Sequence, residues 1–414
     1  MRISTSQFYA NSLDGILNQQ EQLNRLSQQM ATGRRIVNPA DDPSGSARVV
    51  ALSQSIAVAD KYASNAASAV DTLTQESTTL QNVSDLLRQV RNLALQMGNG
   101  TQNDDTRRNA AAAVTNQLSQ LLQLANARDG NGNYLFAGSK SNTQPFALTG
   151  GTPAVSYSGD SGQREVQIHG SRSIPVSDSG QALFMGIRDG NGTFSSVAAS
   201  GNTGTGLIGM GSVLDPAKAT SRLTSGLTSY TITFASGIPD TTFMVTSGSG
   251  ATSGVIASGT YTPGMSVEIQ EAGIAVELQG EPANGDRFTI SPAKNQDVFT
   301  TLAQLRDILS QPTSDPAQKA RFTQQLNQVI GNLDQAQTNI LSAQSAIGVR
   351  LTEARAAQSA NNTLKVQYQT TLSSVQDVNY AEVITQFNQS KVALEAAQKT
   401  FVQIQGLTLF NYIK

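Results

Sequence analysis

Cysteine and tryptophan are both absent from this 414-residue sequence, and histidine occurs once, as His169. Without cysteine the chain can form neither a disulfide framework nor a thiolate metal site. A zinc site would need mainly carboxylate ligands, an uncommon set for that metal. An extracellular location is still compatible with the composition, because a chain of this length can bury large hydrophobic cores without cross-links.

Charged residues are also scarce, since they make up 14% of the sequence and give a formal net charge of -2. This balance favours neither a nucleic-acid-binding surface nor a polybasic membrane anchor, so we expect no nucleic-acid partner. On the predicted helices, Gln, Asn, Ser, Thr and Ala occupy positions where solvated surfaces usually carry Lys and Glu. Such helix faces indicate packing against other protein.

Long hydrophobic runs are missing as well. The sequence has no stretch of about 18 apolar residues, so it predicts no membrane insertion. Residues 1–30 lack the basic start and the unbroken apolar core of a cleavable signal peptide. We therefore expect either a cytoplasmic protein or one that is exported by another route, without a cleaved signal peptide.

The two ends of the chain carry matching apolar stripes. Both the segment from Ala381 to Ile404 and a segment near the amino terminus place apolar residues at alternating steps of four and three, which is typical of a coiled-coil seam. A helix pair this thin would expose much apolar surface in a monomer, which indicates burial against sister subunits. The predicted subunit-assembly seam consists of Ile16, Leu23, Leu26, Met30, Val383, Phe387, Leu394, Phe401 and Ile404.

Long antiparallel helical rods are predicted inside these terminal helices. Asp42–Pro43 and Asp315–Pro316 both read as helix starts, because an aspartate can accept the first free amides while proline lacks one. The four-three rhythm then runs over residues 52–97, where it includes Val70 and Ser77, and over residues 322–347. Two shorter helices are predicted, one at about 105–127 and one that begins at about Val298 and is ended by Pro312.

The middle of the chain is rich in Gly, Ser and Thr and contains short alternating runs, which predict β-strands. The clearest runs are 164–168, 230–234 and 266–270. A strand followed by a turn is also predicted within 134–146. The region forms either a single β domain or two modules that divide near residue 215.

The predicted fold is therefore mainly α with an inserted β region, and its layout is nested. The terminal helices, residues 1–42 and 374–414, pair in a coiled-coil stem. Residues 43–145 and 295–373 form a helical rod domain, and residues 146–294 form the outer all-β part. The chain begins and ends in the same place, and everything between leaves the stem and returns to it.

Three groups of residues suggest chemistry, and each has a simpler interpretation. Gly159–Gly162 resembles a serine-protease loop, but the one histidine, His169, lies on a predicted strand, and a serine nucleophile needs both a base and an orienting group. The segments 129–132 and 189–192 lack the glutamate spacing of an EF-hand and are interpreted as tight turns. Capping explains at least one carboxylate of the Asp41–Asp42 pair. We predict no enzyme activity, no metal and no cofactor.

Several segments resemble the flagellin superfamily of the bacterial axial filament. The most specific is Leu26-Ser-Gln-Gln-Met-Ala-Thr-Gly-Arg-Arg-Ile-Val-Asn-Pro-Ala-Asp-Asp-Pro-Ser-Gly-Ser-Ala47, which is similar to the amino-terminal signature of that family. Its prolines fit the hook-associated branch of the family. The opening residues 1–5, the ending 406–413 and the segments 134–146 and 377–382 are also similar. The signature residues are Gly33, Arg35, Pro39, Asp41, Asp42 and Pro43.

The resemblance implies an exported structural subunit of the bacterial flagellum with no enzyme activity. In this family the terminal helices form the inner tubular layer, the rods form the next layer, and the β region faces outward. The resemblance also implies binding of a flagellar export chaperone, export through the type III apparatus and an extracellular final location. The expected role is to join the hook, through hook-associated protein 1, to the flagellin filament, beside sister subunits.

Two other hypotheses stay open. A minor flagellin would share the same helical physics and would form the filament itself. An extracellular adhesin or binding module would use the β region to bind a carbohydrate or a host surface. Polymerisation of the chain alone separates the first from a junction subunit, and deletion of Phe146–Pro292 tests the second.

Overall fold

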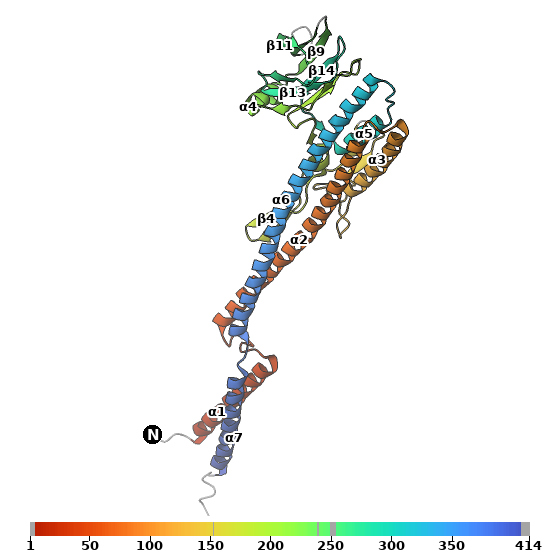
Figure 1. The fold of residues 1–414 in the computed structure, drawn as a ribbon. Helices are drawn as coiled ribbons and strands as arrows, with labels where there is room; N and C mark the ends of the chain where they lie inside the picture. The colour runs from red at the N-terminus through yellow and green to blue at the C-terminus, as the bar shows by residue number, and fades with distance from the viewer. Residues whose placement is uncertain (1–4, 152, 238–239, 249–253, 407–414) are drawn as a thin grey trace, which may run out of the picture. The chain divides into compact units, whose positions relative to one another are not determined.

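The computed structural model describes residues 5–151, 153–237, 240–248 and 254–406. Helices dominate both ends of the described chain and an inserted β region lies between them, which confirms the predicted fold class (Figure 1). The chain divides into two compact units. One unit combines the residues up to Asn65 with those from Ala356 onward, and the other spans Ala66–Arg355. The domain limits expected from the sequence remain predictions.

The helix starts follow from local capping chemistry. α2 begins at Pro43 and α6 begins at Pro316, as predicted from the two aspartate-proline pairs. α5 begins at the predicted residue and ends before Pro312, whereas α3 ends two residues before the end of its predicted range of 105–127. The long helices and α5 are α1 Thr5–Thr32, α2 Pro43–Met97, α3 Asp104–Ala125, α5 Val298–Leu309, α6 Pro316–Gln376 and α7 Tyr380–Gly406.

The second unit buries the apolar stripes of its helices. On α6 the predicted rhythm is buried at Phe322, Leu326, Val329, Leu333, Ala336, Ile340 and Ile347. On α2 the rhythm drifts, because Ala69 and Glu76 are buried where Val70 and Ser77 were expected. An α-helix with 3.6 residues per turn does not keep a seven-residue repeat on one face, so the buried face moves by a residue along the helix.

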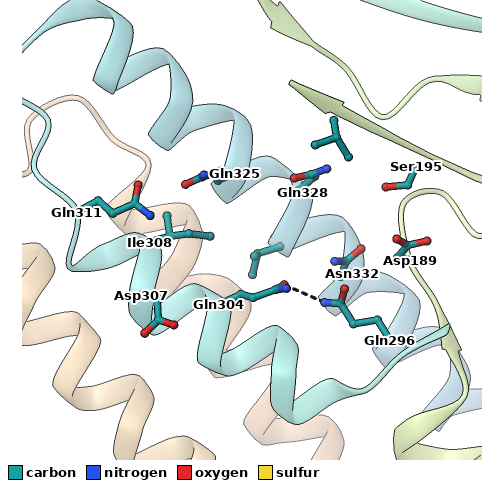
Figure 2. A pocket seen from close by; sticks show the side chains of 12 residues that line it. Asp189, Ser195, Gln296, Gln304, Asp307, Ile308, Gln311, Gln325, Gln328 and Asn332 are labelled. Carbon is teal, nitrogen blue, oxygen red and sulfur yellow. Dashed lines mark hydrogen bonds between the residues drawn. The ribbon is translucent and has the colours of Figure 1, made fainter. Parts of the chain in front are cut away.

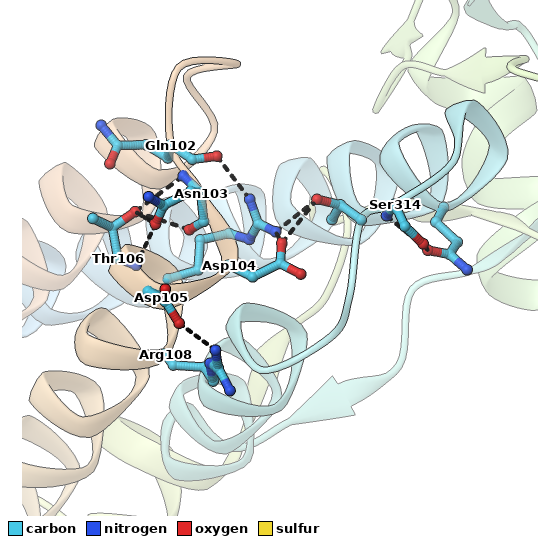
Figure 3. Close-up of polar contacts among 10 residues, drawn as sticks. Gln102, Asn103, Asp104, Asp105, Thr106, Arg108 and Ser314 are labelled. Carbon is cyan, nitrogen blue, oxygen red and sulfur yellow. Dashed lines mark hydrogen bonds and ion pairs between the residues drawn. The ribbon is translucent and has the colours of Figure 1, made fainter.

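The start of α3 is tied to the loop between α5 and α6 by Arg107. Figure 3 shows the polar contacts around Gln102 and Asp104 at this helix start. The Arg107 guanidinium donates hydrogen bonds to the carbonyl of Gln102 at 3.0 Å and to Thr313 Oγ1 at 2.6 Å, and it also pairs with Asp104. It lies 5.0 Å from the centre of the Phe322 ring. One nearly buried cation therefore connects residues 102–107 with the segment 313–322, which is about 200 residues away in the sequence.

The β region is built from short antiparallel strands. A five-stranded sheet has the order β11-β10-β9-β14-β6, and β12, β13 and β7 form a second sheet, with β8 also paired to β13. These strands share one hydrophobic cluster that includes Phe194, Tyr230, Phe234 and Phe288. β6 pairs with β14, and β7 and β8 both pair with β13, although many residues separate the paired strands in the sequence. The number of β modules remains a prediction.

The three runs that the sequence indicated overlap β3, β9 and β12, with limits that differ by one or two residues. The first group is β1 Phe146–Leu148, β2 Val155–Tyr157, β3 Glu165–His169, β4 Arg172–Pro175, β5 Ile187–Arg188, β6 Phe194–Ala198, β7 Leu207–Ile208 and β8 Ser212–Val213. The second group is β9 Tyr230–Ser236, β10 Thr241–Ser247, β11 Gly254–Thr260, β12 Ser266–Ile269, β13 Ile274–Gln279, β14 Arg287–Pro292 and β15 Asn295–Gln296. Short helical turns are η1 Gln181–Met185, α4 Pro216–Ala219 and η2 Thr220–Ser225.

The strand predicted at Tyr134 is wrong. Tyr134 and Ala137 each form only an isolated bridge, with Arg128 and Ser179. Four consecutive side chains from Tyr134 to Ala137 are buried, so the segment does not alternate between a core face and a solvent face as a half-buried strand would. Gly138 then turns the backbone with a φ of 69°. The segment is a buried turn that fills the space beside η1 and β1.

Candidate assembly surface

The predicted pairing of the terminal helices is present, because α1 and α7 pack against each other (Figure 1). The rings of Tyr9 and Phe401 meet edge to face, with centroids 5.9 Å apart. Farther along the pair, Gln19 Nε2 donates to the carbonyl oxygen of Ser390 at 3.3 Å. The contact therefore combines apolar packing with a polar bond between helices from opposite ends of the sequence.

The seam residues are only partly covered within one chain. Leu26 and Val383 are 3% and 6% exposed, so they are buried at the seam. Half-buried positions are Ile16, Leu23, Met30, Phe387, Leu394 and Phe401. The side chain of Ile404 lies outside the described residues. Two helices alone cannot enclose side chains from all directions, so the pair leaves a seam that further helices would complete.

A second set of apolar residues on the same two helices is exposed. Leu13 and Leu17 on α1 are 48% and 53% exposed, and they lie one turn apart on one face. On α7 the exposed apolar residues are Ile384, Val392 and Val402. We call these five residues, Leu13, Leu17, Ile384, Val392 and Val402, the outer apolar stripe. None of the helices in the described ranges has the length and apolar character that a membrane span requires.

The signature segment forms a backbone joint with the end of α6 and the linker that leads to α7. α1 ends at Thr32, and Gly33 follows with a φ of 69°, a conformation that suits glycine at a helix end. The Val378 amide donates to the Gly33 carbonyl at 3.0 Å, and the Arg35 amide donates to the Gln376 carbonyl at 2.7 Å. Both turns between helices in this unit are therefore held together by main-chain hydrogen bonds.

Arg35 strengthens this joint through its side chain. Its Nη2 donates to the Val375 carbonyl at 2.8 Å, at the carboxyl end of α6, where a helix dipole favours a cation. The same guanidinium is 3.4 Å from the carboxylate of Asp42. The sequence marked Arg35 as a signature residue but gave it no partner, because its partner lies 340 residues away. A pair of arginines directly after a helix-ending glycine was the one local signal.

Asp42 and Asp41 are both used as turn and cap residues. Asp42 Oδ1 accepts the Gly45 amide at 2.8 Å and the Ser44 hydroxyl at 2.9 Å. The hydrogen bond from the Gly45 amide, followed by that from Ser44, lowers the pKa of Asp42. Asp41 Oδ2 accepts the Asn38 amide at 3.0 Å in the exposed turn that contains Pro39. Pro43 is the first residue of α2, so the signature describes a turn and a helix start.

The loops that resembled catalytic or calcium sites are turns. In the Gly159–Gly162 loop, Asp160 Oδ1 accepts the amides of Ser139 at 2.7 Å and Gly162 at 3.0 Å. Asp129 Oδ1 accepts the amides of Asn131 and Asn133, each at 2.9 Å. These aspartates hold backbone amides, which is how short polar side chains stabilise turns.

The comparisons with known proteins agree with this geometry. Residues 3–141 match the family model described as the bacterial flagellin N-terminal helical region. The solved structure of flagellar hook-associated protein 3 from Legionella pneumophila superposes with a TM-score of 0.73 at 32% identity, over 79% of this chain and 98% of that chain. The chain belongs to the flagellar hook-associated protein 3 family.

Sequence relatives place the chain within the wider superfamily. Flagellar hook-associated protein 3 of Salmonella typhimurium is 35% identical over 188 residues, which are 45% of this chain and 58% of that protein. The flagellin of Listeria monocytogenes is 24% identical over 131 residues, which are 32% of this chain and 46% of the flagellin. The match thus spans little more than half of the Salmonella protein, and the similarity to a hook-associated protein 3 exceeds the similarity to this flagellin.

Proposed function

We propose that the chain is a structural subunit that joins the flagellar hook to the flagellin filament and assembles through α1 and α7. The observation that carries the proposal is the incomplete α1–α7 pair. Six of its seam residues are only half-buried, and its outer apolar stripe is exposed in one chain. Exposed apolar surface of this kind is stabilised when other subunits cover it. The family membership supplies the filament context.

The proposal includes the partners. Hook-associated protein 1 would contact the chain on the hook side and flagellin on the filament side, with sister subunits between them. A flagellar export chaperone would bind the chain before export, which would occur without a cleaved signal peptide. The low charge of the sequence and the glutamine-rich helix faces support protein partners over nucleic acid.

The proposal is tested by complementing a bacterial strain that lacks this gene. The deletion strain should keep intact hooks and shed flagellin into the medium, and the wild-type chain should restore attached filaments. Phe387→Asp and Leu394→Asp should fail to restore them, because each places an unpaired carboxylate in the seam. Gln398→Asp, at an exposed polar position of the same helix, is the control and should restore attachment. Full complementation by both seam variants would overturn the assembly role.

The minor-flagellin hypothesis predicts a different result with purified protein. A junction subunit should need a hook-associated template, whereas a flagellin should polymerise into long filaments alone. Negative-stain electron microscopy of the concentrated chain separates the two. Long filaments formed without other proteins would replace the junction proposal by the flagellin hypothesis.

A further inference from the structure

A polar groove lies between α5, α6 and the edge of the β region, inside the second unit (Figure 2). Its volume is about 400 Å³, within the range of small-molecule sites. Gln325, Gln328 and Asn332 reach it from α6, while Gln304 and Asp307 reach it from α5. The site is independent of the terminal helices and of the proposed junction role.

The side-chain amides around this groove each use one polar atom in a hydrogen bond within the chain and leave the other polar atom available. Gln328 Nε2 donates to the Ser196 carbonyl at 3.0 Å, and Asn332 Oδ1 accepts the Gly190 amide at 2.9 Å. Gln304 Oε1 accepts Gln296 Nε2 at 2.9 Å. The remaining oxygen of Gln328 and the nitrogens of Asn332 and Gln304 have no partner among the described residues. Each of these side-chain amides is held in place by the hydrogen bond of one polar atom, so its other polar atom is a donor or acceptor in a fixed position.

A buried amide oxygen adds independent evidence for a ligand. Gln325 Oε1 is buried and has no hydrogen-bond partner among the described residues. A buried acceptor without a partner is costly, so each such group in a folded protein needs an explanation. Gln325 belongs to the lining of the groove, so a turn of its side chain toward the groove would let a ligand hydroxyl satisfy this oxygen.

The lining chemistry selects the class of ligand. No Lys, Arg or aromatic side chain lines the groove, which argues against phosphates, acidic peptides and flat heteroaromatic rings. The two lining carboxylates are already engaged, because Asp307 pairs with Arg306 and Asp189 accepts the Lys294 amide at 2.6 Å. Burial also raises the pKa of Asp189, which disfavours its charged form. The aliphatic part of the lining is Val197, Ile308 and Val329.

We propose that this groove binds a neutral sugar. Hydroxyl groups both donate and accept, so they match free amide nitrogens and oxygens together, and the aliphatic residues fit the C–H face of a sugar ring. The groove has room for one or two such rings by the volume given above. This inference goes beyond the proposed junction function, because a filament adaptor needs no small ligand.

The test is saturation-transfer NMR on the full chain with four neutral probes: glucose, galactose, mannose and N-acetylglucosamine. Each is used at about 20 mM, since a millimolar dissociation constant corresponds to only about 4 kcal/mol. Glucose 6-phosphate is the charged counterpart of glucose. We expect at least one neutral sugar to bind and glucose 6-phosphate to bind at least about tenfold more weakly, because the lining offers no cation.

Two variants locate the binding. Gln325→Leu and Gln304→Ala should each weaken sugar binding by roughly tenfold, the effect of losing one well-placed hydrogen bond. Asn327→Leu, at an exposed position of the same helix outside the groove, is the matched control and should bind normally. The proposal is overturned if all four sugars fail to bind, if glucose 6-phosphate binds as well as glucose, or if both groove variants bind as tightly as the wild type.

Discussion

Glu76 shows how one residue can oppose the pattern of the helix that carries it. It lies on α2 and is 0% exposed, and its Oε1 accepts the Asp178 amide at 3.0 Å. Burial, together with the nearby charge of Asp178, raises the pKa of Glu76 to about 8, although Arg350 and Arg164 act in the opposite direction. The sequence pattern placed Ser77 at this point of the stripe, because a glutamate is rarely expected inside a core.

The first prediction concerns the pH dependence of stability. The pKa of Glu76 is raised above the ordinary value of 4.5, so between about pH 5 and pH 8 the folded chain holds a proton that the unfolded chain has released. The stability of the second unit should therefore fall as pH rises through this window. Glu76→Gln keeps the acceptor for the Asp178 amide and removes the titration, so the variant should lose this part of the pH dependence.

Urea unfolding at pH 5, 6.5 and 8, followed by circular dichroism, measures the effect. The stability difference between wild type and Glu76→Gln should grow with pH, in favour of the variant, by an amount on the order of a few kcal/mol. Equal slopes for the two proteins would show that Glu76 does not hold its proton in the folded state.

The second prediction compares two neighbouring arginines at the start of α3 (Figure 3). The Arg107 side chain is 5% exposed and bonds to Gln102, Asp104 and Thr313, whereas the Arg108 side chain is 65% exposed and pairs with Asp105. Arg107→Ala should destabilise the second unit by about 2–3 kcal/mol, because Gln102, Asp104 and Thr313 lose a nearly buried charged donor and the contact with the Phe322 ring is lost. Arg108→Ala should change stability by less than about 0.5 kcal/mol.

Urea midpoints of the two variants measure this comparison. Arg107→Lys is a useful third protein, since a lysine ammonium group cannot reach all the hydrogen-bond acceptors of the guanidinium and cannot stack on the Phe322 ring. It should recover little of the lost stability. Similar midpoints for Arg107→Ala and Arg108→Ala would show that the burial of Arg107 contributes nothing measurable.

At the scale of elements, helices were predictable and the buried turn was not. α5 begins at its predicted residue and ends before Pro312, and α2 and α6 begin at the predicted prolines, because caps and periodicity are local properties of the sequence. The Tyr134–Ala137 segment looked like a strand from its apolar residues. Whether such a run becomes a strand depends on a pairing partner, and that partner is set by tertiary structure. The π-helical turns η1 and η2 also carry no local signal of this kind.

The third prediction tests the joint between α1 and the segment before α7. In Gly33→Ala, the new Cβ would lie 3.2 Å from the hydroxyl of Tyr380, and the φ of 69° is unfavourable for alanine. The substitution should weaken the joint by about 1 kcal/mol. Trypsin cleavage at the Arg34–Arg35 pair should then be roughly fivefold faster, because cleavage follows the population of the opened joint.

Gly100→Ala is the control for this experiment. No atom lies within 4 Å of a Cβ at Gly100, and its φ is not in the left-handed region. Its cleavage rate at Arg34–Arg35 should equal that of the wild type. An unchanged rate in Gly33→Ala would mean that the main-chain bonds to Gln376 and Val378 do not limit opening.

At the scale of the molecule, the sequence predicted that chain ends pair, because the two apolar stripes have the same spacing. It did not predict the main-chain bonds between residues 33–35 and 376–378, since backbone hydrogen bonds leave no trace in side-chain patterns. The groove near Gln325 was missed for a similar reason. Its residues come from three separate segments, and glutamine is common on the long helices of this chain. The assembly seam itself remains a prediction.

Deletion of part of the β region tests the adhesin hypothesis. The Ala293 amide donates to the Thr193 carbonyl at 3.0 Å, so residues 194–292 begin and end at neighbouring points of the backbone. The experiment therefore replaces residues 194–292 with two glycines instead of deleting all of Phe146–Pro292. The two backbone ends left by this shorter deletion lie next to each other. We expect the shortened chain to restore filament attachment. Loss of attachment, with the remaining helices still folded by circular dichroism, would give the β region an essential part in the mechanism.

The last prediction removes one partner of the terminal helix pair. Deletion of Ala381–Lys414 should leave the second unit folded, because the contacts of Glu76, Arg107 and the α6 stripe all lie within Ala66–Arg355. α1 should lose helicity, since a single amphipathic helix without a packing partner is only marginally stable in water. The deletion should also abolish filament attachment in complementation. Circular dichroism and urea unfolding check the folded unit, and a truncated chain that still attaches filaments would contradict assembly through α1 and α7.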